Sequence, residues 1–368
     1  MVKGKIPIFR RLMRKREEPK KYSSTSKISK AKFKKTKALV LVSGGLDSLL
    51  VVKLLQNQGI EVEAVYFATH FDNTKNLRWL DFLINNMNVK INKMNVEPDY
   101  LDMLKKPKYG YGKNMNPCID CHAYMLRKTK RLLKERDAQI IATGEVLDER
   151  PMSQTMKALD IVEKEAGLKN AVLRPLSAKL LPKTVYEIQG LVDREKLLDI
   201  HGRQRTRQLE LAKKYGIEGF NSPAGGCLLT EKEFAKKVKD LIEKGKSFDF
   251  DDVELLKIGR HFRFKECKII VGRNEYENDK IIQLAKDDDL LFEAVSIPSP
   301  VTLLRIKERS TNSEYINAAA LLTACYSDAA RQGINELEIE YRSSKKDSTI
   351  IAEVDLKKCK EFKEKYKV

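Results

Sequence analysis

Residues 38–55, ALVLVSGGLDSLLVVKLL, decide the fold of this chain. Their first five residues form a short apolar, β-branched run that ends at a turn, a pattern typical of a buried parallel strand. The turn SGGLDS, residues 43–48, contains two glycines, which allow consecutive backbone N–H groups to approach a phosphate closely. The apolar positions that follow predict a helix, whose N-terminus offers a phosphate unpaired donors and the positive end of the helix dipole.

Alternating strand and helix patterns continue from this point to about residue 175. Apolar strand patterns occupy 62–70, 89–96, 138–146 and 170–177, and helical patterns lie between them. This alternation predicts an α/β fold, a doubly wound parallel sheet with helices on both faces. Ligands of such sheets bind at the carboxyl ends of the strands, where we place the phosphate loop, Thr143-Gly144-Glu145 and Arg174-Pro175-Leu176.

Composition and charge divide the chain further. The net charge is +19, and the first 37 residues alone carry 15 Lys or Arg and 2 Glu. This basic tail is either a solvated segment or an arm that binds phosphate backbones. We expect an ATP-binding domain over 38–180, a helical extension over 181–250 and an α+β domain over 251–368. No apolar run is long enough to span a bilayer and no secretory signal is present, so we expect a cytoplasmic protein.

Three of the six cysteines lie in loops that contain glycine or proline. Cys118 and Cys121 form a CxxC that follows Asn116-Pro117, and Cys227 follows Gly225-Gly226. We consider three roles: a zinc site completed by His122, a redox pair or persulfide relay, and a [4Fe–4S] cluster held by three thiolates. The patterns around Cys267 and Cys325 predict core positions, and Cys359 looks incidental in its lysine-rich segment.

The loop SGGLDS resembles the pyrophosphate loop of the PP-loop, or N-type, ATP pyrophosphatases, which have an adenine nucleotide α-hydrolase-like fold. Asn116-Pro117-Cys118 and Gly226-Cys227 resemble the two cysteine sites of bacterial tRNA 2-thiouridylases. Ala142-Thr143-Gly144 and Arg174-Pro175-Leu176 are similar to segments of those enzymes and of 4-thiouridine synthetases. The similarity covers about residues 38–230, without the rhodanese domain or flanking zinc fingers that some tRNA thiolation enzymes have.

A second resemblance covers about residues 255–345. Val271-Gly272-Arg273-Asn274, Lys286-Asp287-Asp288-Asp289 and Thr302-Leu303-Leu304-Arg305 are similar to the NFACT-R domain of proteins that bind RNA. In that family a Trp or His usually follows the aspartate run, whereas Leu290 follows it here. The resemblance implies that tRNA is a partner, bound with help from the basic tail, the helix 126–136 and the arginine cluster 203–207.

These resemblances imply an ATP-dependent tRNA sulfurtransferase that adenylates a uridine carbonyl and then replaces its oxygen with sulfur. Asp47 would help to hold Mg²⁺, Cys118, Cys121 and Cys227 would hold a [4Fe–4S] cluster, and all four are expected catalytic residues. Sulfide or a cysteine desulfurase would donate the sulfur, and a homodimer is a further expectation. The remaining alternatives are a PP-loop ligase that acts on a small molecule and a vestigial ribosome- or tRNA-associated RNA-binding factor. The expected ATP-binding residues are Ser43, Gly44, Gly45, Leu46, Asp47, Ser48, Phe67, Thr143, Gly144 and Arg174.

Overall fold

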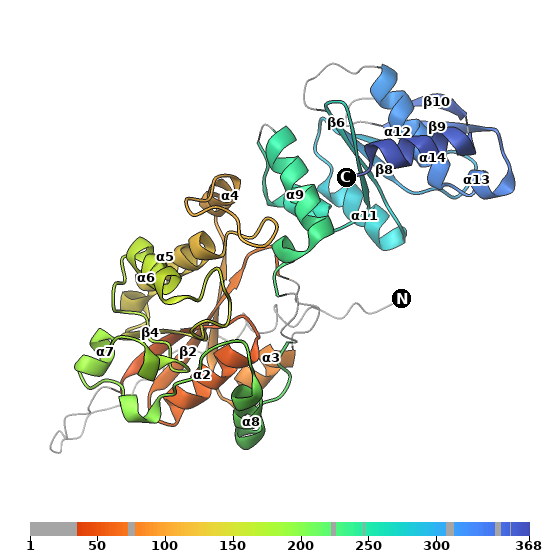
Figure 1. Ribbon diagram of the computed structural model, residues 1–368. Coiled ribbons are helices and arrows are strands. Elements are labelled where there is room, and N and C mark those ends of the chain that lie inside the picture. The colour runs from red at the N-terminus through yellow and green to blue at the C-terminus, as the bar shows by residue number, and fades with distance from the viewer. Residues whose placement is uncertain are drawn as a thin grey trace, which may run out of the picture. The chain divides into compact units, whose positions relative to one another are not determined.

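The computed structural model describes residues 35–72, 78–221, 226–245, 247–306, 313–342, 347–353 and 355–368. The basic tail lies almost entirely outside these ranges. The first part of the described chain contains a parallel four-stranded sheet with the order β3-β2-β1-β4 (Figure 1). Its strands are β1 (Lys37–Leu41), β2 (Glu61–Ala68), β3 (Lys90–Asn95) and β4 (Ile140–Thr143). The expected parallel α/β sheet is therefore confirmed.

Helices cover both faces of this sheet (Figure 1). Successive side chains of a strand point to opposite faces, so Ala38 and Val40 of β1 pack in one apolar core while Leu39 packs in another. The first core includes residues of α2 (Leu46–Gln56), α3 (Arg78–Asp81), the π-helical turn at Phe82–Asn86 and α8 (Thr206–Tyr215). The second includes residues of α4 (Pro98–Lys105), α5 (Cys118–Glu135) and α9 (Lys232–Lys244). The sheet is thus the middle layer of three.

The polypeptide after β4 is mostly short helices joined by loops. Its elements are α6 (Met156–Ala166), α7 (Val185–Ile188) and 3₁₀ turns at Ala178–Leu180, Arg194–Lys196 and Leu228–Thr230. The predicted strand 170–177 is wrong, because only Leu173 bridges to Ala142 in the sheet. Pro175 follows closely and has no N–H for a strand ladder. Within the described ranges, no helix is both long and apolar enough to cross a membrane.

The C-terminal part forms a separate antiparallel sheet with the order β10-β9-β7-β8-β6-β5. Neighbouring residues of β6 again face opposite sides: Ile269 packs in the core that includes α12, and Ile270 packs in the core that includes α10 and α11. This arrangement confirms the expected α+β character. The strands are β5 (Arg260–Phe264), β6 (Cys267–Val271), β7 (Leu290–Ala294), β8 (Thr302–Arg305), β9 (Glu336–Arg342) and β10 (Asp347–Glu353). The helices are α10 (Phe250–Leu256), α11 (Glu275–Leu284), α12 (Ser313–Tyr326), α13 (Ala329–Gln332) and α14 (Leu356–Tyr366).

Two cysteines of the C-terminal part have a different role from the one that the sequence suggested. Cys325 of α12 and Cys359 of α14 form a disulfide with a Cα–Cα distance of 5.7 Å. Cys325 is therefore more than a packed core residue, and Cys359 is not incidental. The lysine-rich pattern of α14 concealed this pairing, because one buried face of an exposed helix is enough to bring Cys359 against α12. Cys267 is a buried free thiol, as expected for a core residue.

Candidate functional site

The phosphate loop, residues 43–48, joins the end of β1 to the start of α2. Gly44 has φ +80°, and a Cβ there would lie 2.5 Å from the indole Nε1 of Trp79. Glycine is therefore required both by the backbone angle and by the close approach of Trp79. No side chain caps α2 at Gly45, so the N–H groups of its first turn face the loop without a side-chain acceptor. Such donors, together with the helix dipole, favour an anion at this helix N-terminus, which agrees with the phosphate loop expected from the sequence.

Two distant segments enclose this loop. Gly144, just after β4, lies so close to α2 that a Cβ on it would be 2.7 Å from the backbone nitrogen of Ser48. On another side, the N–H of Asn221 donates to the carbonyl oxygen of Gly44 over 2.8 Å. The Thr-Gly motif that the sequence placed at a strand end therefore contacts the loop directly, through a glycine that no other residue type can replace without displacing α2.

Asp47 is poised to bind a cation. Its Oδ2 lies 3.4 Å from Nη2 of Arg205, while its Oδ1 is buried and has no hydrogen-bond partner. Burial raises the pKa of Asp47, although the charges of Arg205 and Arg150 oppose this increase. Magnesium in nucleotide sites usually binds one or two carboxylates together with phosphate oxygens and water. The unpartnered Oδ1 therefore fits the predicted role in holding Mg²⁺ with the phosphates of ATP.

The remaining predicted ATP-binding residues offer few free polar groups to a nucleotide. Leu46 and Phe67 are buried in apolar cores, so only their backbones can face a nucleotide. The Thr143 hydroxyl donates to Oε2 of Glu145 over 3.0 Å, and its backbone N–H donates to Leu173. A nucleotide could therefore contact the backbone of these residues but would meet no free polar side chain on them.

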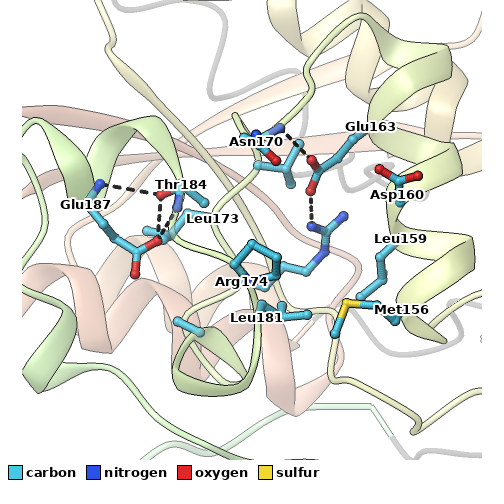
Figure 2. A pocket seen from close by; sticks show the side chains of 13 residues that line it. Met156, Leu159, Asp160, Glu163, Asn170, Leu173, Arg174, Leu181, Thr184 and Glu187 are labelled. Atoms are coloured by element: carbon cyan, nitrogen blue, oxygen red, sulfur yellow. Dashed lines mark hydrogen bonds and ion pairs between the residues drawn. The ribbon is translucent and has the colours of Figure 1, made fainter.

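Arg174 does not present a free positive charge. Its side chain is 3% exposed, with Nε 2.9 Å from Oε2 of Glu145 and Nη1 against Glu163. Figure 2 shows Arg174 bound to Glu163 beside a small pocket between α6 and α7. Burial would raise the pKa of Glu145, but the charge of Arg174 and a hydrogen bond from His122 outweigh it and lower the pKa to about 2. The predicted contact between Arg174 and ATP is not supported, because two carboxylates already engage this guanidinium.

The cysteine site, which we define as Cys118, Cys121 and Cys227, combines the first turn of a helix with the residue before a 3₁₀ turn, so the expected loop position of the CxxC is wrong. Cys118 is the first residue of α5 and Cys121 lies one turn later. Cys227 directly precedes the 3₁₀ turn at Leu228–Thr230. The N–H of Leu228 donates to the carbonyl oxygen of Phe71 over 2.8 Å. The N–H of Met115 in turn donates to the carbonyl oxygen of Leu229 over 3.1 Å. These backbone bonds bring the third cysteine to the CxxC, as the sequence predicted.

The three thiols are free and partly buried. The thiol of Cys118 donates to Oδ1 of Asn116 over 2.9 Å, and the Tyr100 hydroxyl lies 3.3 Å from the sulfur of Cys121. Burial raises the pKa of all three thiols, that of Cys227 to about 12, and the charge of Cys118 acts on both of the others. Cys121 and Cys227 also pack against the same apolar core, which brings these two thiols to one face of the sheet.

This arrangement does not fit the predicted metal centre. Among the described residues, which include all three cysteines and His122, no group of three His, Cys, Asp or Glu side chains is placed to hold a metal ion. Nδ1 of His122 instead lies 2.8 Å from Glu145. The carboxylate of Asp120 accepts the backbone N–H groups of Lys108 and Tyr109, so it holds a turn and is not free for proton transfer. Neither a [4Fe–4S] cluster nor a zinc ion is supported by these positions.

Sequence reasoning missed several residues at this edge of the sheet. Arg205 was assigned to a basic RNA-binding cluster, yet its guanidinium contacts Asp47. Gln208 is fully buried in the first turn of α8 and its side-chain amide has no hydrogen-bond partner. Arg150 follows β4 by seven residues, in a loop that we did not single out. Its place after a strand of the parallel sheet was the available signal, since such loops carry the ligand contacts.

Two family models match separate parts of the chain. Residues 33–180 match the family model described as "Thiamine biosynthesis protein (ThiI)", and residues 259–367 match the model described as "NFACT protein RNA binding domain". The fold and its loop thus define a PP-loop domain. The chain combines a PP-loop domain of the kind found in tRNA thiolation enzymes with a C-terminal domain of the NFACT RNA-binding type.

Individual relatives cover only parts of the chain. The "tRNA-specific 2-thiouridylase MnmA 1" of Aliarcobacter butzleri is 26% identical over 200 residues, which are 48% of this chain and 53% of that protein. A "Probable tRNA sulfurtransferase" of Thermococcus kodakarensis is 26% identical over 234 residues, 63% of this chain and 52% of its own length. This chain therefore spans about half the length of these two curated relatives. A solved 4-thiouridine synthetase–RNA complex with bound ATP aligns at 19% identity and a TM-score of 0.35, covering 60% of this chain and 52% of that chain.

Proposed function

We propose that this protein is an ATP-dependent tRNA sulfurtransferase that adenylates a carbonyl oxygen of a uridine and replaces that oxygen with sulfur. The observation that carries the proposal is that one parallel sheet combines a phosphate loop after β1 with three free thiols, of which Cys227 bridges to Asp72 just after β2. A phosphate site and a sulfur-carrying site are the two parts that this reaction needs. The thiouridylase and sulfurtransferase relatives support the choice of tRNA as the substrate.

The first step uses the phosphate loop. The carbonyl oxygen of the uridine attacks the α-phosphorus of ATP, an O–P bond forms, and pyrophosphate leaves. The N–H groups of residues 43–48 hold the phosphates, and Gly144 and Asn221 keep the loop in shape. Mg²⁺ bound beside Asp47 would neutralise charge on the leaving pyrophosphate. The adenylated base then carries AMP, which is a good leaving group.

The second step uses the cysteine site, and we derive no part of it from a metal cluster. A persulfide on Cys118 or Cys227 attacks the base carbon with its terminal sulfur, a C–S bond forms, and AMP leaves with the former carbonyl oxygen. The other thiol attacks the cysteine sulfur of the resulting protein–base disulfide and releases the thiolated base. This exchange leaves a Cys–Cys disulfide, which an external dithiol must reduce before the next turnover. A cysteine desulfurase would supply this sulfur at the oxidation level of a persulfide, by transferring the outer sulfur of its own persulfide to the reduced thiol of Cys118 or Cys227. Sulfide would supply it only by attacking the Cys–Cys disulfide in place of the external dithiol, which forms a persulfide on one cysteine and frees the other thiol.

Binding of tRNA is assigned to the basic surfaces and to the C-terminal domain. The match of residues 259–367 to an RNA-binding domain supports this assignment. The helix α5 adds Arg127, Lys130 and Arg131, which are all exposed. Phosphate contacts of this kind provide affinity and position, and the target base must then leave its stack to reach the site.

Nucleoside mass spectrometry tests the function directly. Transfer RNA from cells with and without this gene is digested and analysed, and one thiolated nucleoside should disappear with the gene. That nucleoside also reveals the modified position and whether sulfur enters at C2 or C4. Persistence of every thionucleoside in cells with no redundant enzyme would refute the proposal.

Cysteine variants of the purified chain test the second step. Replacing Cys118 or Cys227 by Ala should abolish thionucleoside formation, while tRNA-dependent pyrophosphate release continues up to about one equivalent per tRNA, because AMP then stays on the adenylated base. Cys267→Ala is the matched control, because Cys267 is a free thiol in the core of the C-terminal part. Iron analysis of protein purified without oxygen completes the test. About four irons per chain that are lost in Cys118→Ala would refute the persulfide relay and support a [4Fe–4S] cluster.

A further inference from the structure

The loop 149–154, ERPMSQ, follows β4 and contacts Arg205 at one end and the surroundings of Gly112 at the other. Hydrogen bonds within the chain fix its path: the N–H of Glu149 donates to Val146 over 3.2 Å, and that of Gln154 donates to Arg150 over 2.9 Å. The N–H of Asp148 also donates to the carbonyl oxygen of Gln154 over 2.9 Å. The loop is therefore closed at its base, and its side chains have defined directions.

One end of this loop is tied to the phosphate side. Oε1 of Glu149 lies 3.9 Å from Nε of Arg205, and Nη2 of the same arginine lies 3.4 Å from Oδ2 of Asp47. Glu149 and Asp47 are close enough for the charge of Asp47 to raise the pKa of Glu149, after the larger effect of burial. The first residue of the loop is thus connected to the start of α2 through one shared guanidinium.

The other end is tied to the cysteine side. Ser153 is 1% exposed, and Met152 lies 3.8 Å from the position of a Cβ on Gly112, whose N–H donates to the carbonyl oxygen of Asn116 over 2.8 Å. The side chain of Asn116 accepts a hydrogen bond from the thiol of Cys118 over 2.9 Å, and hydrogen bonding from Ser153 also lowers the pKa of Cys118 against the larger effect of burial. Arg150 and Pro151 lie between these two anchors. Because Pro151 favours an extended backbone for the preceding residue, Arg150 projects from a restrained position and not from a flexible tip.

The side chain of Arg150 is exposed and available. No carboxylate among the described residues lies within ion-pair distance of its guanidinium, in contrast to the engaged Arg174 and Arg205. Its charge nevertheless acts on both sites, since it lowers the pKa values of Asp47 and Glu149 on one side and of Cys118 and Cys227 on the other. The preceding residue, Glu149, shares Arg205 with Asp47, and Met152 packs beside Gly112 on the cysteine side, so Arg150 lies on the backbone between these two contacts.

The α-phosphate is the one group that belongs to both halves of the reaction. It is attacked in the first step, stays on the base in the adenylate, and leaves as AMP in the second. From the position of the loop we infer that Arg150 contacts the α-phosphate of ATP and remains on it in the adenylated base. An arginine suits this role because its planar fork binds phosphate through two parallel hydrogen bonds. The part of this inference that concerns the adenylate rests on the proposed function.

Nucleotide binding tests the contact without requiring turnover. The affinities of the purified full chain for adenosine, AMP and α,β-methylene-ATP are measured by calorimetry for the wild type, Arg150→Ala, Arg150→Lys and Lys157→Ala. Arg150→Ala should weaken binding of AMP and of the ATP analogue by the same factor, 10-fold or more, and leave adenosine binding within twofold. Arg150→Lys should recover part of the loss. Lys157 is an exposed cation seven residues further along and serves as the control, with all three affinities within twofold of the wild type.

Pyrophosphate release with tRNA is the second readout. Arg150→Ala should lower its rate by about 10²–10³-fold, the usual effect of removing one preorganised charge donor from a transition state. Unchanged AMP affinity in Arg150→Ala, or weakened binding of the ATP analogue alone, would overturn the inference and assign Arg150 elsewhere or to the β- and γ-phosphates. If the wild type binds AMP through Arg150 but forms no thionucleoside, the proposed function fails while the contact stands.

Discussion

The buried charges around Glu145 give a stability prediction that can be worked from the structure. The carboxylate of Glu145 is 7% exposed and accepts hydrogen bonds from Arg174 over 2.9 Å and from Thr143 over 3.0 Å. A pKa lowered from 4.5 to about 2 in the folded protein corresponds to about 3 kcal/mol of stabilisation at neutral pH. Glu145→Gln removes this charge and leaves Arg174 buried with only one carboxylate.

We therefore expect Glu145→Gln to lower the free energy of unfolding by about 3–5 kcal/mol at pH 7, the usual cost of breaking a buried ion pair. Because the folded pKa of Glu145 is below the unfolded one, the stabilisation is complete above pH 4.5 and is lost as the pH falls towards 2. The difference between wild type and variant should accordingly narrow by roughly 1 kcal/mol when the pH is reduced to 3.5.

Urea unfolding followed by tryptophan fluorescence provides the assay. Trp79 is the single tryptophan of the chain and is fully buried in a core that packs on the same sheet. Its emission therefore reports on unfolding of this part of the protein. Glu165→Gln is the matched control, since Glu165 forms its ion pair with Lys108 nearer the surface, where such pairs contribute about 0–1 kcal/mol. A loss below about 1 kcal/mol for Glu145→Gln, or a loss that does not change with pH, would refute the reasoning.

Three further predictions concern the phosphate loop and the disulfide. Gly144→Ala should weaken ATP binding at least 10-fold in calorimetry, because its Cβ would displace the start of α2, whereas Gly226→Ala, with no atom within 4 Å of the added Cβ, should leave ATP binding within twofold. Asp47→Asn should reduce tRNA-dependent AMP formation 100-fold or more in a radiometric assay and should weaken the dependence of that rate on Mg²⁺; full activity would exclude Asp47 as a metal ligand. The Cys325–Cys359 disulfide closes a separation of 34 residues, so its reduction should destabilise the C-terminal part by about 3–4 kcal/mol in the chain-entropy model. Dithiothreitol should therefore lower the midpoint of thermal unfolding. Six alkylatable thiols in the unreduced protein would show that the bond is absent.

The sequence by itself determined the phosphate loop and the sheet around it. The strand, the two glycines and the helix are contiguous in residues 38–55, so local conformational preferences are sufficient to form the anion-binding turn. The alternation of apolar strands with helices likewise predicted a parallel sheet, because its pattern repeats along the chain. The three catalytic candidates Cys118, Cys121 and Cys227 were recognisable from their loops before their positions were known.

Only the tertiary structure decided what surrounds these residues. Whether Arg174 faces ATP or two carboxylates, and whether Arg205 faces RNA or Asp47, depends on segments that lie far away in the sequence. The same holds for the pairing of Cys325 with Cys359 and for the contacts of the loop that carries Arg150 with Arg205 and with the surroundings of Gly112. A local pattern specifies which backbone a segment adopts, but the partner of a side chain is set by how the layers pack. For this reason two arginines that each follow a strand pattern differ in the folded protein: Arg174 forms a buried ion pair, whereas Arg150 has no carboxylate of the described residues within ion-pair distance.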